Sequence, residues 1–138
     1  MGSTFSALQP ERKQFVRLAN DIPIRYKFLA KMIDLGPEQI HEGVTSSLSG
    51  GGCLMFGRIP SLNWIPALLM GKIRVGVNLL LPSLDQPIKA LCRVAWVEAF
   101  EEGSDRVSLG LAFDDLPKES QDEIMKHIIR TQMTSRGN

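Results

Sequence analysis

The sequence has almost no net charge. Its 16 Lys and Arg residues are balanced by 15 Asp and Glu residues, which leaves a formal charge of +1 at pH 7. Proteins that bind nucleic acid polymers without sequence preference present a strongly basic surface, so this composition argues against that class. Any site for an anion must therefore be local and formed by a few neighbouring cations.

Long hydrophobic runs are also missing. The apolar stretch Ile59–Gly71 contains two prolines and is shorter than the roughly 20 residues that a helix needs to span a bilayer. The first residues do not follow the pattern of a secretory signal. We therefore expect no membrane insertion and a cytoplasmic protein.

Cysteine and histidine are scarce. Cys53 and Cys92 lie inside apolar runs without metal-ligand spacing, which favours small core side chains and leaves a disulfide between them open. His41 and His127 do not belong to a pattern typical of nucleophilic catalysis or metal binding. We expect neither an enzyme nor a cofactor or metal site.

A chain of 138 residues with 43% apolar residues is sufficient for one domain with one core. We expect residues 1–10 to form a flexible N-terminal segment, residues 11–134 to form the single domain, and residues 135–138 to form a tail.

Alternating apolar and polar residues predict a mainly β protein. Within the fifth expected strand, Ile88, Cys92 and Trp96 should face the same side because alternation places every second residue on one face. A short helix is expected at Ala67–Met70, ending at Gly71. Strands are expected at residues 21–29, 42–49, 53–57, 72–81, 87–100 and 106–113, which together predict a small six-stranded antiparallel β-barrel.

One longer helix should follow the last strand. Pro117 suits a first helical position, and Asp114 and Asp115 would lie near the positive end of the helix dipole. Apolar residues then recur at helical spacing and should pack on the sheet or cover one end of the barrel. These residues are Ile124, Met125, Ile128, Ile129 and Met133.

Two polar segments stand out from this framework. Ser47–Gly52 (SLSGGG) ends in three glycines directly before an apolar run, and Arg12–Arg17 (RKQFVR) carries three cations. Glycine allows a positive φ or a close approach, so the glycines indicate a tight turn or a barrel bulge. Neither the phosphate-loop pattern nor the dinucleotide fingerprint fits, because a strand follows. The two segments together would form a local anion site, whereas separately they would be a bulge and a solvated charge run.

The order of these parts resembles the PilZ domain family over residues 11–130. That family has an Arg-x-x-x-Arg arm, a short strand, an Asp/Asn-x-Ser-x-x-Gly turn, a six-stranded barrel and a terminal helix. Here the arm is Arg12–Arg17, the strand includes IPIRY at residues 22–26, the turn is Ser47–Gly52, and the last strand ends in GLAF at residues 110–113.

PilZ domains are known as receptors for the bacterial second messenger cyclic di-GMP. The resemblance implies that arginines on the arm hold phosphate oxygens and the guanine O6/N7 edge. It implies that the first turn residue addresses the Watson–Crick edge of guanine, and that the serine and the glycine backbone complete the site. The implied ligand-binding residues are Arg12, Lys13, Arg17, Ser47, Ser49, Gly51 and Gly52.

The sequence departs from the family pattern at two of these positions. Lys13 replaces the first motif arginine and loses its bidentate fork, and Ser47 replaces the expected Asp or Asn. Losing one good polar pair costs roughly 1–3 kcal/mol, about ten- to a hundredfold in affinity. Arg12 supplies a guanidinium next to Lys13, and it leaves open whether one ligand or a stacked pair binds.

Two functions follow from the resemblance. In the first, the domain binds cyclic di-GMP, the arm becomes ordered, and the changed surface signals to a downstream protein. In the second, the substitutions at Lys13 and Ser47 have abolished nucleotide binding. The domain is then a degenerate protein–protein interaction module that could form a homodimer through its helix. If the site is intact, Arg17 and Ser49 should face each other across an open groove.

Overall fold

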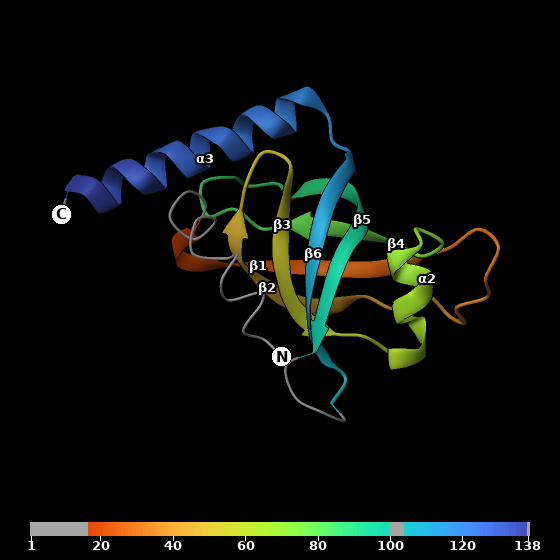
Figure 1. The fold of residues 1–138 in the computed structure, drawn as a ribbon. Helices are drawn as coiled ribbons and strands as arrows, with labels where there is room; N and C mark the ends of the chain where they lie inside the picture. The colour runs from red at the N-terminus through yellow and green to blue at the C-terminus, as the bar shows by residue number, and fades with distance from the viewer. Residues whose placement is uncertain (1–16, 100–103, 138) are drawn as a thin grey trace.

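The computed structural model describes residues 17–99 and 104–137. Nearly all of the described chain between the first strand and the last helix contributes to one barrel and the segments that cover it (Figure 1). The elements are β1 (Arg17–Leu29), β2 (His41–Leu48), β3 (Gly52–Arg58), the 3-10 helix η1 (Leu62–Trp64), α2 (Ile65–Leu69), β4 (Arg74–Leu79), β5 (Ile88–Ala99), β6 (Arg106–Asp115) and α3 (Lys118–Gly137).

The six strands close into an antiparallel barrel in the order β1-β2-β3-β6-β5-β4. The predicted fold class is therefore confirmed. Closure comes from the pairing of β4 with β1, in which Ile24 lies opposite Leu79. Side chains that alternate along each strand point inward and form the core, as Ile22, Ile24 and Tyr26 do along β1.

The helix α3 begins where the sequence predicts it and lies across one end of the barrel (Figure 1). Only part of its apolar stripe packs as expected, since Ile124 and Ile128 are buried. Met125, Ile129 and Met133 stay 40%, 52% and 66% exposed. The expectation that the whole stripe packs was wrong, because the stripe is wider than the contact and the helix continues past the strands.

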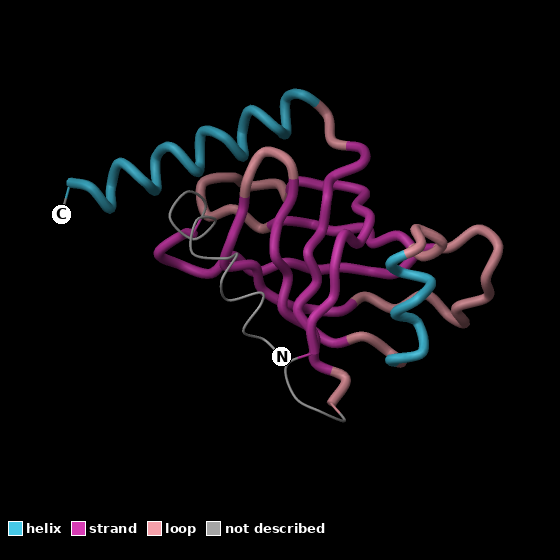
Figure 2. The backbone as a smooth tube through the Cα atoms, in the orientation of Figure 1, coloured by secondary structure: helices cyan, strands magenta, loops and turns pink. Residues whose placement is uncertain are grey.

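The segment between β3 and β4 contains the predicted short helix. It starts earlier than expected, with η1 leading into α2, and α2 ends at Leu69, two residues before Gly71, whose φ is 77°. Trp64 packs edge-on against Phe28, with ring centroids 5.3 Å apart. This segment and the β1–β2 loop gather at one side of the barrel, away from α3 (Figure 2).

A bulge in β5 overturns the prediction that Trp96 faces the same side as Cys92. Val94 pairs with Leu111, but Trp96 pairs with the next residue back, Gly110. The residue between them, Ala95, is extra, so the alternation is reset. Trp96 therefore lies on the outer face of the barrel.

Asp114 has ion-pair partners that the sequence did not indicate. It lies at the end of β6 and forms ion pairs with Arg74 of β4 at 2.6 Å and Arg93 of β5 at 3.2 Å. Two cations on the neighbouring strands thus bind this carboxylate.

Cys53 and Cys92 are both buried and form no disulfide. Burial raises the pKa of the Cys53 thiol to about 12, and burial raises the pKa of Cys92 as well. The interpretation of both as core side chains is confirmed. Among the described residues, none of the helices combines the length and the hydropathy that a membrane-spanning helix needs.

Candidate ligand-binding site

The turn between β2 and β3 is closed by hydrogen bonds of Ser49. Its amide donates to the carbonyl of Gly52 at 2.9 Å, and its hydroxyl donates to the same carbonyl at 3.3 Å. The same hydroxyl oxygen accepts from the amide of Gly51 at 3.3 Å. Ser49 therefore stabilises the turn with its own side chain.

In this turn Gly52 is required for space rather than for a positive φ. Among the described residues only Gly36 and Gly71 have a positive φ, so the expectation of a positive φ in the glycine run was wrong. A Cβ on Gly52 would lie 2.0 Å from the carbonyl oxygen of Leu111. The expected close approach is present, and the approaching group is the backbone of β6. At Gly51 a Cβ would have no atom within 4 Å, so the turn is open on that side.

The turn lies between the end of β6 and the start of α3. The amide of Phe113 donates to the carbonyl of Gly51 at 2.9 Å. The side-chain amide of Gln121, on α3, donates to the carbonyl of Gly50 at 3.2 Å. The sulfur of Met125 would be 3.1 Å from a Cβ at Gly50. The helix is thus in direct contact with the turn (Figure 1).

A second bulge, in β2, decides which way Ser47 faces. Thr45 and Leu48 both point into the core, although regular alternation would place residues 45 and 48 on opposite faces. Both ladders of β2 shift register in this region, and the Thr45 hydroxyl donates to the carbonyl of Ser47 at 3.0 Å. Ser47 consequently lies on the outer face, beside the turn.

The structure brings together four of the predicted site residues at this end of β2 and β3, namely Ser47, Ser49, Gly51 and Gly52. Arg17 is not in an arm ahead of the first strand, as expected, but begins β1, where it is the Cα partner of Ser47. Arg12 and Lys13 lie outside the described residues. The prediction that Arg17 and Ser49 face each other across an open groove depends on the Arg17 side chain. The structure does not describe that side chain, so this stays a prediction.

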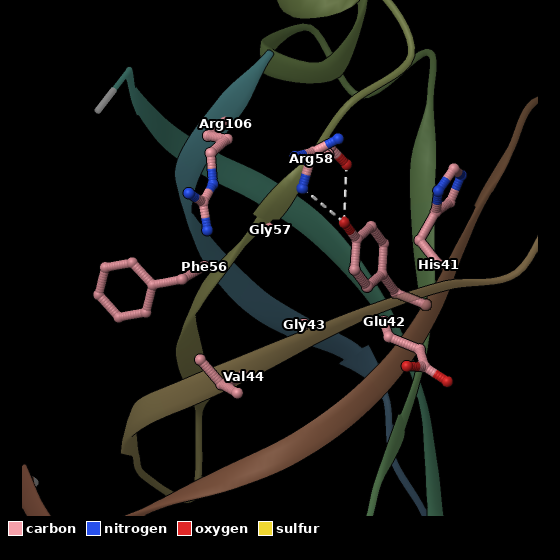
Figure 3. A pocket seen from close by; sticks show the side chains of 9 residues that line it. His41, Glu42, Gly43, Val44, Phe56, Gly57, Arg58 and Arg106 are labelled. Carbon is pink, nitrogen blue, oxygen red and sulfur yellow. Dashed lines mark hydrogen bonds between the residues drawn. The ribbon is translucent and has the colours of Figure 1, made fainter. Parts of the chain in front are cut away.

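A pocket of about 340 Å³ lies at the opposite end of β2 and β3 from the turn (Figure 3). Its lining includes Tyr26, His41, Arg58 and Arg106, and none of the predicted ligand-binding residues. Figure 3 draws two hydrogen bonds that join the Tyr26 hydroxyl to the backbone of Arg58. His41, expected in a loop, begins β2 and stacks on Tyr26 with ring centroids 5.2 Å apart.

Two titratable groups outside the turn have shifted pKa values. Burial raises the pKa of Tyr26 above its usual value. Burial and the positive charge of Arg130 lower the pKa of His127. Within the described part of the chain, no cluster of His, Cys, Asp or Glu could hold a metal ion.

Comparison with known proteins gives a family and a fold. The family model of the PilZ domain matches residues 11–130. A comparison with curated protein sequences found no similar protein. Among solved structures, the Bacillus subtilis inhibitor of motility MotI/DgrA is similar with a TM-score of 0.63 and 16% identity over 91% of this chain and 53% of that one.

K. pneumonia MrkH in its apo state is similar with a TM-score of 0.60 and 16% identity, over 88% of this chain and 50% of that one. A further structure of MrkH, described as a c-di-GMP-dependent transcription regulatory factor, has a TM-score of 0.53 and 15% identity over 81% of this chain and 46% of that one. The chain thus spans about half the length of these structures, and the likeness shows a shared fold.

Proposed function

Since this chain belongs to the PilZ domain family, we propose that it is a cytoplasmic receptor module for cyclic di-GMP. The ligand binds at the β2–β3 turn and at the strand positions beside it. The domain then signals to a downstream protein. The description of MrkH as a c-di-GMP-dependent regulator supports this choice of ligand.

One observation carries the proposal. The backbone register makes Arg17 the Cα partner of Ser47, directly beside the open turn that contains Ser49 and Gly51. The last motif arginine and the turn motif are separated by thirty residues of sequence, yet β1 and β2 bring them to one end of the barrel. A motif whose halves meet in space is stronger support than either half alone.

The chemistry follows from these residue types. Guanidinium groups of Arg12 and Arg17 bind phosphate oxygens or the O6/N7 edge of guanine with paired hydrogen bonds, and Lys13 adds a point charge. The Ser47 hydroxyl, on the outer face, contacts the guanine edge. The backbone of Gly51 and Gly52 lets the ligand approach closely, because Gly51 has open space beside it.

Contacts of the turn with α3 support a route for the signal. Gln121 binds the carbonyl of Gly50, and Met125 lies against the same residue. A ligand that pulls on the turn therefore acts on the first turns of α3. Met125, Ile129 and Met133 stay exposed on that helix, so a change in its position alters an apolar surface offered to a partner.

The test is calorimetric titration of cyclic di-GMP into the purified protein. We expect binding in the micromolar range or tighter, which Arg17→Ala abolishes and Arg17→Lys weakens. Arg25→Ala is the matched control, since Arg25 is an exposed cation on the same strand, opposite Glu42 and away from the turn. The fitted ratio distinguishes one ligand from a stacked pair.

The second candidate is a degenerate interaction module that binds no nucleotide, favoured by Lys13, Ser47 and the exposed apolar residues of α3. Absence of heat at high protein concentration would contradict the receptor proposal. Sedimentation analysis of the same sample would then test for a homodimer.

A further inference from the structure

The wall of the barrel opens at the end of β2 and β3 that lies away from the turn. Pairing between these strands ends at Val44 and Phe56, although β2 begins at His41 and β3 continues to Arg58. The opening contains the pocket of about 340 Å³ drawn in Figure 3. Regular pairing of the two strands would close this gap, so the pocket depends on their separation.

Tyr26 holds the two strand ends apart and forms the floor of the pocket. Its hydroxyl donates to the Arg58 carbonyl and accepts from the Arg58 amide, so both backbone groups are satisfied without a residue of β2. A Cβ at Gly57 would collide with this hydroxyl, and a Cβ at Gly43 would lie 3.2 Å from the ring. Glycine at both positions makes room for the ring, so the pocket is built into the fold.

Two arginines of neighbouring strands line this pocket together. Arg58 and Arg106 are Cα partners in the β3–β6 ladder, which places their Cβ atoms roughly 5 Å apart on one face of the sheet. In Figure 3 the Arg106 guanidinium extends toward β3. Like charges directly opposite each other destabilise a sheet, so this pair favours an anion between the two side chains.

The neighbouring carboxylates neutralise this pair only in part. Asp105 lies 3.8 Å from the Nε of Arg58, and the two side chains are 51% and 68% exposed, so water screens their attraction. Among the described residues, none forms an ion pair with Arg106. Glu42 also lines the pocket, but its carboxylate points toward β1 in Figure 3, where Arg25 is its Cα partner. The described part of the pocket therefore has an excess of positive charge beside the arginine pair.

We propose that this pocket binds a small phosphate monoester, at a second site separate from the β2–β3 turn. A phosphate monoester carries about 1.5 to 2 negative charges at neutral pH, and its oxygens accept paired hydrogen bonds from guanidinium groups. It can therefore bind Arg58 and Arg106 at once, whereas a single carboxylate brings charge for only one of them. The pocket contains none of the described residues of the turn, so the assignment is independent of cyclic di-GMP binding.

The rest of the ligand lies against aromatic rings. Tyr26 and His41 line the same pocket and stack with ring centroids 5.2 Å apart. A cavity of about 340 Å³ is at the small end of the range for ligand sites, which suits a phosphoryl group with one ring-sized substituent. We therefore expect an aromatic phosphate ester to bind more tightly than inorganic phosphate.

The test is a titration of isotope-labelled protein with phenyl phosphate at constant ionic strength, followed by heteronuclear NMR. We expect saturable shifts of the backbone amides of Gly43, Gly57 and Arg106, whereas the amide of Gly51 in the turn should not move. Inorganic phosphate lacks the ring and benzoate carries a single charge. Each should bind about tenfold more weakly than phenyl phosphate.

Variants of the arginine pair test the source of the affinity. Arg106→Gln should weaken the binding of phenyl phosphate about tenfold, and Arg106→Lys should have a smaller effect because it keeps the charge but loses the paired donors. Lys89→Gln is the matched control, since it removes an exposed cation of β5 that lies outside this pocket. It should leave the affinity unchanged.

Thermal unfolding of the same proteins gives a second measurement. Arg106→Gln should not lower the melting temperature, because it removes a repulsion and an exposed side chain. Phenyl phosphate should raise the melting temperature of the unaltered protein and of Lys89→Gln. It should not raise that of a variant carrying both Arg58→Gln and Arg106→Gln.

Three outcomes would overturn the assignment. The first is a set of amide shifts that grow with phenyl phosphate and do not saturate. The second is equal affinity of the unaltered protein and the variant with both substitutions. The third is equal affinity for benzoate and phenyl phosphate. Since the probe is not cyclic di-GMP and the site is not the turn, these outcomes leave the proposed receptor function untouched.

Discussion

The hydroxyl of Tyr26 and the backbone of Arg58 form a reciprocal pair of hydrogen bonds. The hydroxyl donates to the Arg58 carbonyl at 2.7 Å and accepts from the Arg58 amide at 2.8 Å. Tyr26 is on β1 and Arg58 ends β3, so this link spans β2, which lies between them. Gly43 and Gly57 make room for the ring, because a Cβ at either would lie within 3.2 Å of it.

We therefore expect Tyr26→Phe to lower the free energy of unfolding by about 1–3 kcal/mol. The variant keeps the ring but leaves both backbone groups of Arg58 without this partner. Urea denaturation followed by circular dichroism measures the difference. A loss below about 0.5 kcal/mol would show that water replaces the hydroxyl at no cost.

The same tyrosine predicts a loss of stability at high pH. Burial raises the pKa of Tyr26 in the folded state above its usual value of 10.0, so the folded chain holds this proton more tightly than the unfolded chain does. The stabilisation that comes from this tighter proton binding is fully present below about pH 10, and it is lost as the pH rises through the pKa of Tyr26 in the folded protein. The difference in free energy of unfolding between the unaltered protein and Tyr26→Phe should therefore become smaller above about pH 10.

Absorbance provides an independent measure of this titration, because Tyr26 is the only tyrosine of the chain. Tyrosinate absorbance of the folded protein should appear at higher pH than in urea. Coincident titration curves in the two solvents would contradict the burial argument.

Gly51 and Gly52 make a matched pair within the candidate site. Gly52→Ala should lower the free energy of unfolding by about 1–3 kcal/mol, because its Cβ would collide with the Leu111 carbonyl in the β3–β6 ladder. Gly51→Ala should change stability by less than about 0.5 kcal/mol, since it meets open space. Chemical denaturation measures the free energy of unfolding of both variants, and we expect the larger loss in Gly52→Ala. Equal losses in the two variants would contradict the close packing of Gly52 against β6.

Asp114 connects three neighbouring strands through its two ion pairs. Its carboxylate is 23% exposed, and the two arginines are 43% and 56% exposed, so each pair is partly screened by water. Asp114→Asn should reduce the free energy of unfolding by about 0.5–2 kcal/mol, with a smaller reduction at high salt. Asp115→Asn is the control, because the described residues offer its carboxylate no ion pair. A similar loss of unfolding free energy in both variants would show that the two ion pairs of Asp114 do not stabilise the fold.

Much of the fold could be predicted from the sequence because it depends on local patterns. Alternation along residues 21–29 and 106–113 marks strands that the structure contains, and Pro117 marks the start of α3. The glycine run marks the β2–β3 turn for a similar reason, since only glycine fits against the Leu111 carbonyl. The motif order also indicated the PilZ family, which the family model confirms.

Pairing between strands decided the rest. A bulge in β2 turns Ser47 outward, and a bulge in β5 turns Trp96 outward. Both bulges arise from the register with neighbouring strands, so they cannot be predicted from the alternation within one strand. Which half of the α3 stripe is buried depends on where the barrel ends. The sequence by itself determined the elements and their order, whereas the closed barrel determined which side chains share the outer face, because that face is built from partners distant in the chain.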